Sequence, residues 1–171
     1  MDARPFIDSL DFAGNGRQIS GKIPVAELPR LLDVLEYPQG TLQYTVCGGA
    51  DKQGNPLLDV SITGGCRLRC QRCLGALEHV VRLDTRLLLR DQASLDALDV
   101  TDDGIADGEE EFDSILADAH LDVLNLLEEE ILLSLPFAPK HEFGACRAAD
   151  GGNMLKEEKN PFAILAQLKR C

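Results

Sequence analysis

Two cysteines three residues apart are the clearest chemical signal in this sequence. The segment Cys70-Gln-Arg-Cys73-Leu-Gly75 has the Cys-x-x-Cys-x-Gly form of a zinc knuckle. In such a knuckle both thiolates face one ion, and the glycine takes a left-handed backbone conformation. A structural zinc takes four ligands. His141 and Cys146 are the candidates for the other two, so the predicted site is one zinc held by Cys70, Cys73, His141 and Cys146.

Two other interpretations of this turn remain open. The thiols can be reduced and without a ligand, or they can form a redox pair. A thioredoxin-like pair places its first cysteine at the start of a helix that follows a strand, whereas here a strand is expected to follow the turn. Cys66 shares a strand face with Cys70 and is either a core residue or a substitute ligand. Cys47 is expected to be buried, and Cys171 to be a free terminal thiol.

A set of arginines surrounds the cysteine turn. Six lie within 24 residues, with Glu78 and Asp84 as the acids among them: Arg67, Arg69, Arg72, Arg82, Arg86 and Arg90. Guanidinium groups bind phosphates bidentately, so this row predicts contact with an RNA backbone. The segment has no aromatic residue, so contact by shape and phosphate is expected, with little base reading. The alternative is a solvated sheet face with arginines paired to acids.

The net charge of −12 conceals two very different regions. Residues 91–130 hold fifteen Asp or Glu and no Lys or Arg, whereas the rest of the chain has fourteen acids against seventeen bases. A mildly basic body therefore carries one acidic block, and whole-chain charge does not exclude a nucleic acid partner.

The elements that must position these residues are mainly strands. Residues 76–90 alternate, so that Val81, Leu83 and Leu87 point one way while Arg82 and Arg86 point the other. Similar patterns and a turn rich in Gly, Asn and Pro at residues 51–56 predict further strands over residues 18–24, 41–49 and 57–70. We expect an α+β fold, in which a few helices pack on an antiparallel sheet that is curved or barrel-like.

Helical periodicity predicts three helices, at residues 26–35, 121–135 and 161–170. In the second, Glu128, Glu129 and Glu130 are interpreted as a solvated side; the alternatives are a docking surface for a basic protein, or a cover over the arginines. Phe162, Leu165 and Leu168 form the apolar stripe of the third. Mobile loops are expected at about 91–110, which is acidic, and at about 140–160. Residues 1–171 form a single domain in this interpretation.

Three stretches together resemble the YceD family, over roughly residues 18–170. They are Leu68-Arg-Cys-Gln-Arg-Cys-Leu74, the acidic segment from Leu121 to Leu-Pro136, and Asn160-Pro-Phe-Ala-Ile-Leu-Ala-Gln-Leu-Lys169. The resemblance implies a bacterial cytoplasmic protein needed for normal levels of large-subunit ribosomal RNA. Parts of that family resemble a fuller zinc ribbon with a second cysteine pair, where this chain has Cys146 alone.

The expected function is therefore a non-catalytic factor that supports synthesis, processing or stability of 23S ribosomal RNA. Its expected partner is that RNA or its precursor. The second hypothesis is a protein-interaction module that acts through its acidic helix without RNA contact. No nucleophile elbow, phosphate loop or dinucleotide motif is present, and His79, His120 and His141 are scattered, so no enzyme activity is expected. The acidic start and the lack of a long apolar run predict no signal peptide and no membrane partner.

Overall fold

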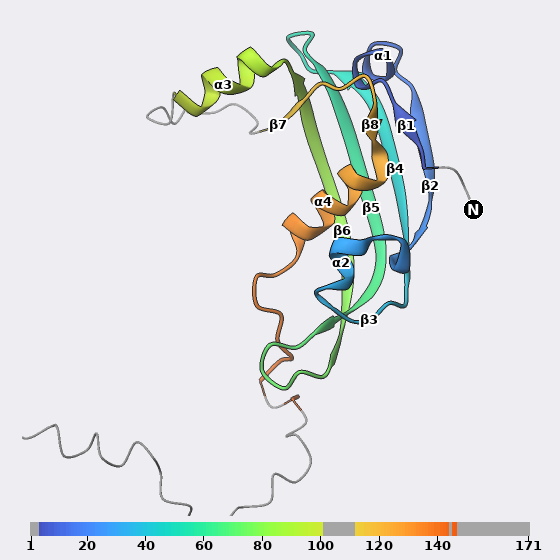
Figure 1. Cartoon of the computed structure of the whole chain (residues 1–171), viewed down its shortest axis with the longest axis vertical. Helices are drawn as coiled ribbons and strands as arrows, with labels where there is room; N and C mark the ends of the chain where they lie inside the picture. The colour runs from blue at the N-terminus through green and yellow to red at the C-terminus, as the bar shows by residue number, and fades with distance from the viewer. Residues whose placement is uncertain (1–3, 101–111, 144, 147–171) are drawn as a thin grey trace, which may run out of the picture.

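A six-stranded sheet forms the centre of the protein. The computed structural model describes residues 4–100, 112–143 and 145–146. The strand order is β2 (Gln18–Pro24), β4 (Thr41–Ala50), β5 (Pro56–Arg69), β6 (Ala76–Arg90) and β7 (Asp113–Leu116), and β3 (Leu35–Tyr37) also pairs with β5. All pairs are antiparallel except β6 with β7. In the described part of the chain the long strands bend but do not close a barrel (Figure 1), which confirms the α+β class with a curved sheet.

The alternation predicted for the central strands is confirmed. Leu42, Tyr44 and Val46 of β4 are buried on one face. The neighbouring Val60 and Ile62 of β5 are buried on the same face. Side chains of the other parity on β5 and β6 point outward, and we call the surface they form with those of β2 and β4 the open face.

Helices cover the opposite, apolar face of the sheet. These are α1 (Ser9–Gly14), α2 (Pro29–Leu32) and α4 (Val123–Ser134), with α4 lying across β5 and β6 (Figure 1). A small two-stranded sheet of β1 (Phe6–Ile7) and β8 (Leu121–Asp122) leads into α4. The hydrophobic core lies between these layers, and its largest fully buried side chains include Leu28, Leu31, Leu42, Leu58, Ile62, Leu87, Leu127 and Ile131.

The helix predicted at residues 26–35 is wrong as a continuous element. The chain forms a 3-10 turn, Val25–Glu27, then the short helix α2, and Leu35 already pairs with Leu68 in the sheet. Pro29 explains the break, because it has no N–H for a helix that began earlier but suits the first position of a new one. Leu28, Leu31 and Leu35 are nevertheless buried, as their spacing predicted.

The acidic region is only partly described, and its first part is not the predicted loop. Residues Gln92–Val100 form helix α3, and the Asp91 carboxylate accepts a hydrogen bond from Ser94 N at 2.8 Å at the helix start. Residues 101–111 lie outside the described residues. So do the predicted terminal helix at 161–170 and most of the predicted loop at 140–160, so neither prediction is tested.

The helix predicted at residues 121–135 is confirmed as α4, but its acidic side is not solvated as interpreted. Residues Leu121–Asp122 form β8, and the Asp122 carboxylate caps α4 by accepting from Leu124 N and Asn125 N. Glu128 and Glu130 are buried, and only Glu129 of the three glutamates is exposed. Burial raises the pKa of Glu130, as do the nearby Asp113 and Glu129 carboxylates.

The packing of α1 on the sheet gives a testable prediction at Gly48. A Cβ added there would press on the Phe12 carbonyl oxygen and lie 2.7 Å from the Ala13 Cα. Both are backbone atoms that cannot move alone, so we expect Gly48→Ala to lower the free energy of unfolding by about 2–3 kcal/mol. Gly49→Ala is the matched control, because its Cβ would meet only Leu57 Cδ1 at an ordinary 3.7 Å. Urea unfolding that shows equal losses for both variants would contradict this account.

Candidate functional site

The predicted cysteine turn joins β5 to β6. Cys70 N donates to Gly75 O at 2.9 Å, and Leu74 N donates to Cys70 O at the same distance, which closes a compact loop. The left-handed residue is Leu74, with φ of 59°, and not Gly75 as the knuckle pattern predicted. The turn therefore presents Cys70 and Cys73 on one side, although its backbone differs from the expected one.

A distant segment brings the other two candidate ligands to this turn. Gln71 N donates to Pro139 O at 2.8 Å, which ties residues 136–146 to the hairpin end. The Cys70 and Cys146 sulfurs are 3.7 Å apart, and His141 Nδ1 is 3.4 Å from Cys73 Sγ and 3.6 Å from Cys146 Sγ. All four donor atoms lie within 4.8 Å of one another. The structure thus assembles the predicted set of three cysteines and one histidine.

These separations fit the ligand shell of a tetrahedral zinc. Sulfur at about 2.3 Å and nitrogen at about 2.0 Å from one ion lie roughly 3.5–3.8 Å from one another. The three distances between the donor atoms are 3.4–3.7 Å and agree with that range, and three thiols with one imidazole are a typical structural zinc set. Cys66 is buried but is not in this set, so it is a core residue and not a substitute ligand. Cys47 is half-buried and not fully buried as predicted.

The imidazole of His141 is oriented by a second contact. Its Nε2 lies 2.9 Å from the Ala76 carbonyl oxygen, which accepts the Nε2 proton. That tautomer leaves the lone pair of Nδ1 directed at the thiols, as in many metal sites where a backbone carbonyl fixes the ring. Sequence alone identified His141 as a candidate but gave no sign of this partner.

The Arg72 side chain forms hydrogen bonds with the cysteine cluster and with the loop that carries His141 and Cys146. Its Nε donates to Cys146 Sγ at 2.9 Å, and its Nη2 donates to the carbonyl oxygens of His141 and Glu142. The hydrogen bond to Cys146 raises the pKa of Arg72. Arg72 thus holds the loop that carries two of the candidate ligands and offsets part of the negative charge of the thiolates.

The environment of the cluster favours thiolate at Cys70. Burial alone would raise the pKa of Cys70, but hydrogen bonds with Cys73, His141 and Arg72 outweigh it and lower the pKa to about 5. At Cys146 burial is likewise outweighed by the hydrogen bond from Arg72, and its pKa is lowered. At Cys73 the backbone hydrogen bond of Gly75 is outweighed by burial and by the contacts with Cys70 and Cys146, and the pKa is raised. The thiolate is the form that binds metals, so the surroundings favour metal binding at Cys70 and Cys146.

The other five arginines lie along the β5–β6 hairpin, and most have partners. Arg67 pairs with Glu78 at 3.5 Å, Arg69 with Glu36 at 2.7 Å and Arg86 with Asp59 at 2.9 Å. Arg90 Nε donates to Ser114 Oγ at 3.1 Å. Arg82 is exposed, and none of the ion pairs recorded for the described residues involves it. The open face is therefore a mixed surface of both signs, and not an uninterrupted basic track.

The structure adds an aromatic residue that the hairpin itself lacks. Phe112, just before β7, lies with its ring centroid 5.8 Å from the Arg86 guanidinium. An open pocket of about 550 Å³ adjoins this pair and is lined by Asp59, Ser61, Asp84, Thr85 and Asp113 among others. Only the three-dimensional pairing of β6 with β7 brings Phe112 next to Arg86.

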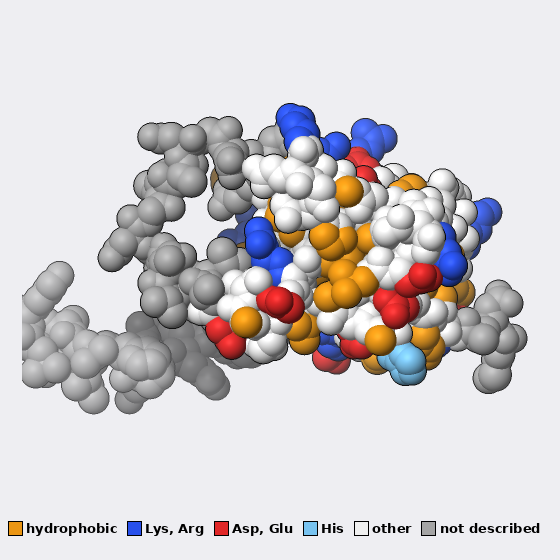
Figure 2. Space-filling view, turned by 90° about the horizontal axis from the view of Figure 1, so that it is seen from above, with side chains coloured by type: hydrophobic (Ala, Val, Ile, Leu, Met, Phe, Trp, Pro, Cys, Tyr) orange, Lys and Arg blue, Asp and Glu red, His pale blue; other side chains and the backbone are white. Residues whose placement is uncertain are grey.

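Basic and acidic side chains are also interspersed at the end of the molecule that Figure 2 shows.

Together these features define a small α+β protein with an open curved sheet and a cysteine–histidine cluster suited to a metal. The chain belongs to the YceD family, whose model, described as large ribosomal RNA subunit accumulation protein YceD, matches residues 58–169. That match begins within β5, covers about two thirds of the chain and includes all four residues of the cluster. No solved structure matches the chain significantly. The described helices are all too short or too polar to cross a membrane.

Proposed function

We propose that the protein is a non-catalytic cytoplasmic factor that supports synthesis, processing or stability of 23S ribosomal RNA during large-subunit biogenesis. The observation that carries this proposal is membership of a family described by large ribosomal RNA subunit accumulation. The partner is large-subunit ribosomal RNA or its precursor. The alternative, an interaction module that binds a basic ribosomal protein through the acidic helix, has less support because two of the three glutamates of α4 point into the protein.

Within this function, the cysteine cluster holds one structural zinc. Three thiols and one imidazole would complete a tetrahedral shell, which leaves no open position for a substrate or an activated water. The ion would fasten residues 136–146 to the β5–β6 hairpin, next to Arg67 and Arg69 at the end of β5. Its role is then to hold the shape of this end of the molecule.

The open face is the proposed RNA-binding surface. Exposed ion pairs contribute only about 0–1 kcal/mol each, so a phosphate can displace the carboxylate partners of the arginines at little cost. We expect Arg67→Gln, Arg69→Gln, Arg82→Gln and Arg86→Gln together to weaken binding to a 23S ribosomal RNA transcript at least about tenfold. The slope of log affinity against log salt should become shallower by roughly one for each lost phosphate contact.

The control for this prediction replaces Arg4 and Arg17 with Gln, since both are exposed arginines outside the hairpin. Their removal should leave both the affinity and the salt slope nearly unchanged. Circular dichroism checks that each variant is folded. Equal binding by the hairpin variant and the unmodified protein at matched salt would rule out the open face as the RNA surface, whereas no RNA binding by either at low salt would favour the interaction module.

A further inference from the structure

Within the residues that the structure describes, strand β6 has a long unpaired edge. On one side it pairs with β5 from Ala76 to Leu88. On the other side, within the described residues, β7 pairs only with Leu87–Arg90. Among the described residues, the Ala76 carbonyl with His141 is the one hydrogen bond of a backbone group on that side along residues 76–86. Such an edge is a ready template for another strand.

The register shows which backbone groups face this edge. Arg90 O accepts from Ala117 N on the β7 side, and Ala76 O accepts from His141 on the same side. Because backbone groups alternate along a strand, the N–H and C=O of Glu78, Val80 and Arg82 point the same way. The side chains of these three residues are exposed on the open face. Within the described part of the chain, the same three residues therefore offer both free backbone hydrogen-bonding groups at the edge and exposed side chains on the open face.

The side chains around Val80 are self-complementary. Val80 is 75% exposed, which is unusual for a large apolar residue on an unpaired edge. Glu78 stands two residues before it and Arg82 two residues after it. In an antiparallel pair of identical strands centred on Val80, a two-fold axis places Val80 opposite Val80 and Glu78 opposite Arg82, twice. Charges on an edge usually prevent pairing, but these are placed to attract a second copy.

We propose that two copies of this chain associate through residues Glu78–Arg82 of their β6 edges, antiparallel and centred on Val80, so that the two sheets join across the dimer. Ala76, whose carbonyl oxygen accepts from His141, lies outside the paired segment. The same register brings Leu77 opposite Leu83 on the helix-covered face, where both side chains are only half-buried in one copy. Helix α4 packs on β6, and its C-terminal end extends past this edge (Figure 1). Leu133, in the last turn of α4, is 75% exposed.

Charge reversal tests this interface on the full chain. Glu78→Arg alone would place an arginine opposite Arg82 at both of the equivalent positions in the dimer. Arg82→Glu alone would place a glutamate opposite Glu78 at both positions. Like charges across an interface cost several kcal/mol, so we expect the dissociation constant of each variant to rise at least about tenfold. An equimolar mixture of the two variants restores Arg opposite Glu at both places, and it should form a heterodimer. Sedimentation equilibrium measures the molecular mass in solution, and hence the fraction of dimer, for each variant and for the mixture.

Lys22→Glu is the matched control, since Lys22 is an exposed cation on the same face but on the far edge strand β2. It should dimerise like the unmodified protein, and thermal melts should show that all variants are folded. An unmodified protein that stays monomeric at every concentration would overturn the proposal. So would a dimer that persists in both single variants, or a mixture of the two that remains monomeric.

Discussion

Removal of zinc is expected to loosen one end of the molecule selectively. If the ion is bound, protein purified without a metal-binding tag should contain about one zinc per chain, because the four donors complete one tetrahedral shell. After chelation, hydrogen exchange should accelerate by more than about tenfold in residues 70–75 and 136–146, since the ion supplies much of the energy that holds such a site together. The strands β4 and β5, whose core lies elsewhere, should exchange as before.

The thiols themselves provide the control for this prediction. Cys73→Ser should abolish zinc binding and reproduce the effect of the chelator, whereas Cys47→Ser should retain a full equivalent of zinc because Cys47 is not in the cluster. A metal content near zero in unmodified protein would favour empty thiols. In that case a disulfide between cluster cysteines after mild oxidation, detected by mass spectrometry, would indicate the redox pair. RNA binding by the open face does not depend on this outcome.

The hairpin elements could be predicted closely from sequence because their signals are local. Alternation over residues 76–90, the turn at 51–56 and the cysteine turn each depend on neighbouring residues, and β6 begins and ends where the pattern does. His141 and Cys146 were candidates because they lie close together in one predicted loop, where the family resemblance places a second pair of ligands. The helix predicted at 26–35 was wrong because the helical spacing of the leucines continues through Pro29, whereas a proline cannot lie inside a continuous helix.

The contacts that depend on distant segments had no local signal. Arg72 was assigned to RNA with its neighbours, and its place in the cysteine turn also predicted that it would offset thiolate charge. Its direct partner, Cys146, lies 74 residues away and had no local signal. No sequence pattern singles out Gly48, because its constraint comes from α1, which packs against it. Glu128 was interpreted with Glu129 and Glu130 as a solvated side, because a charge in an amphipathic pattern is usually exposed. Its actual partners come from α2, nearly one hundred residues earlier in the chain.

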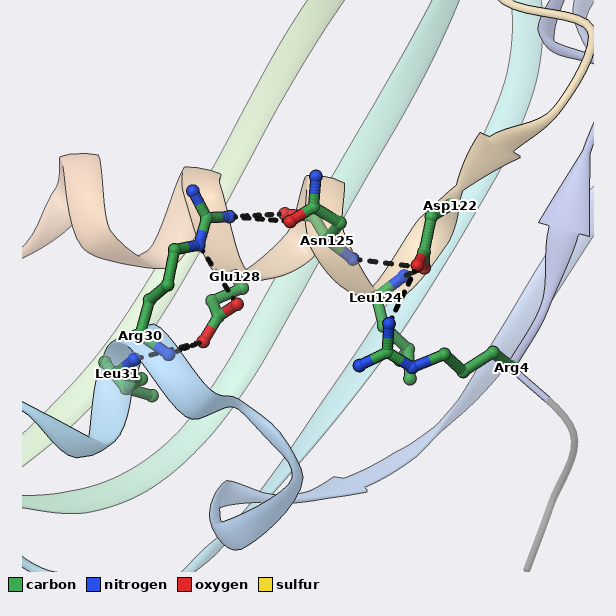
Figure 3. Close-up of polar contacts among 7 residues, drawn as sticks. All are labelled: Arg4, Arg30, Leu31, Asp122, Leu124, Asn125 and Glu128. Carbon is green, nitrogen blue, oxygen red and sulfur yellow. Dashed lines mark hydrogen bonds and ion pairs between the residues drawn. The ribbon is translucent and has the colours of Figure 1, made fainter.

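Glu128 caps helix α2 from a distance (Figure 3). Its Oε1 accepts from Arg30 N at 2.6 Å and from Leu31 N at 3.0 Å, and its Oε2 lies 3.1 Å from Arg30 Nε. These are among the first N–H groups of α2, which have no partner within their own helix. The residue at the cap position, Leu28, has no side-chain acceptor, so the carboxylate of α4 takes that role. The contact also fastens α4 to the layer that covers the sheet.

Glu128→Ala is therefore expected to be among the most destabilising single changes in the chain. It leaves the backbone N–H groups of Arg30 and Leu31 unpaired, whereas the Arg30 side chain is 45% exposed and can be solvated. We therefore expect the free energy of unfolding to fall by about 2–4 kcal/mol. Glu128→Gln keeps an acceptor for these donors and loses only the charge, so a loss of about 1–2 kcal/mol is expected. Glu129→Ala, an exposed neighbour in the same helix, should change stability by less than about 0.5 kcal/mol. Urea unfolding measures all three, and a Glu128→Ala loss no larger than that of Glu129→Ala would show that the cap contributes nothing.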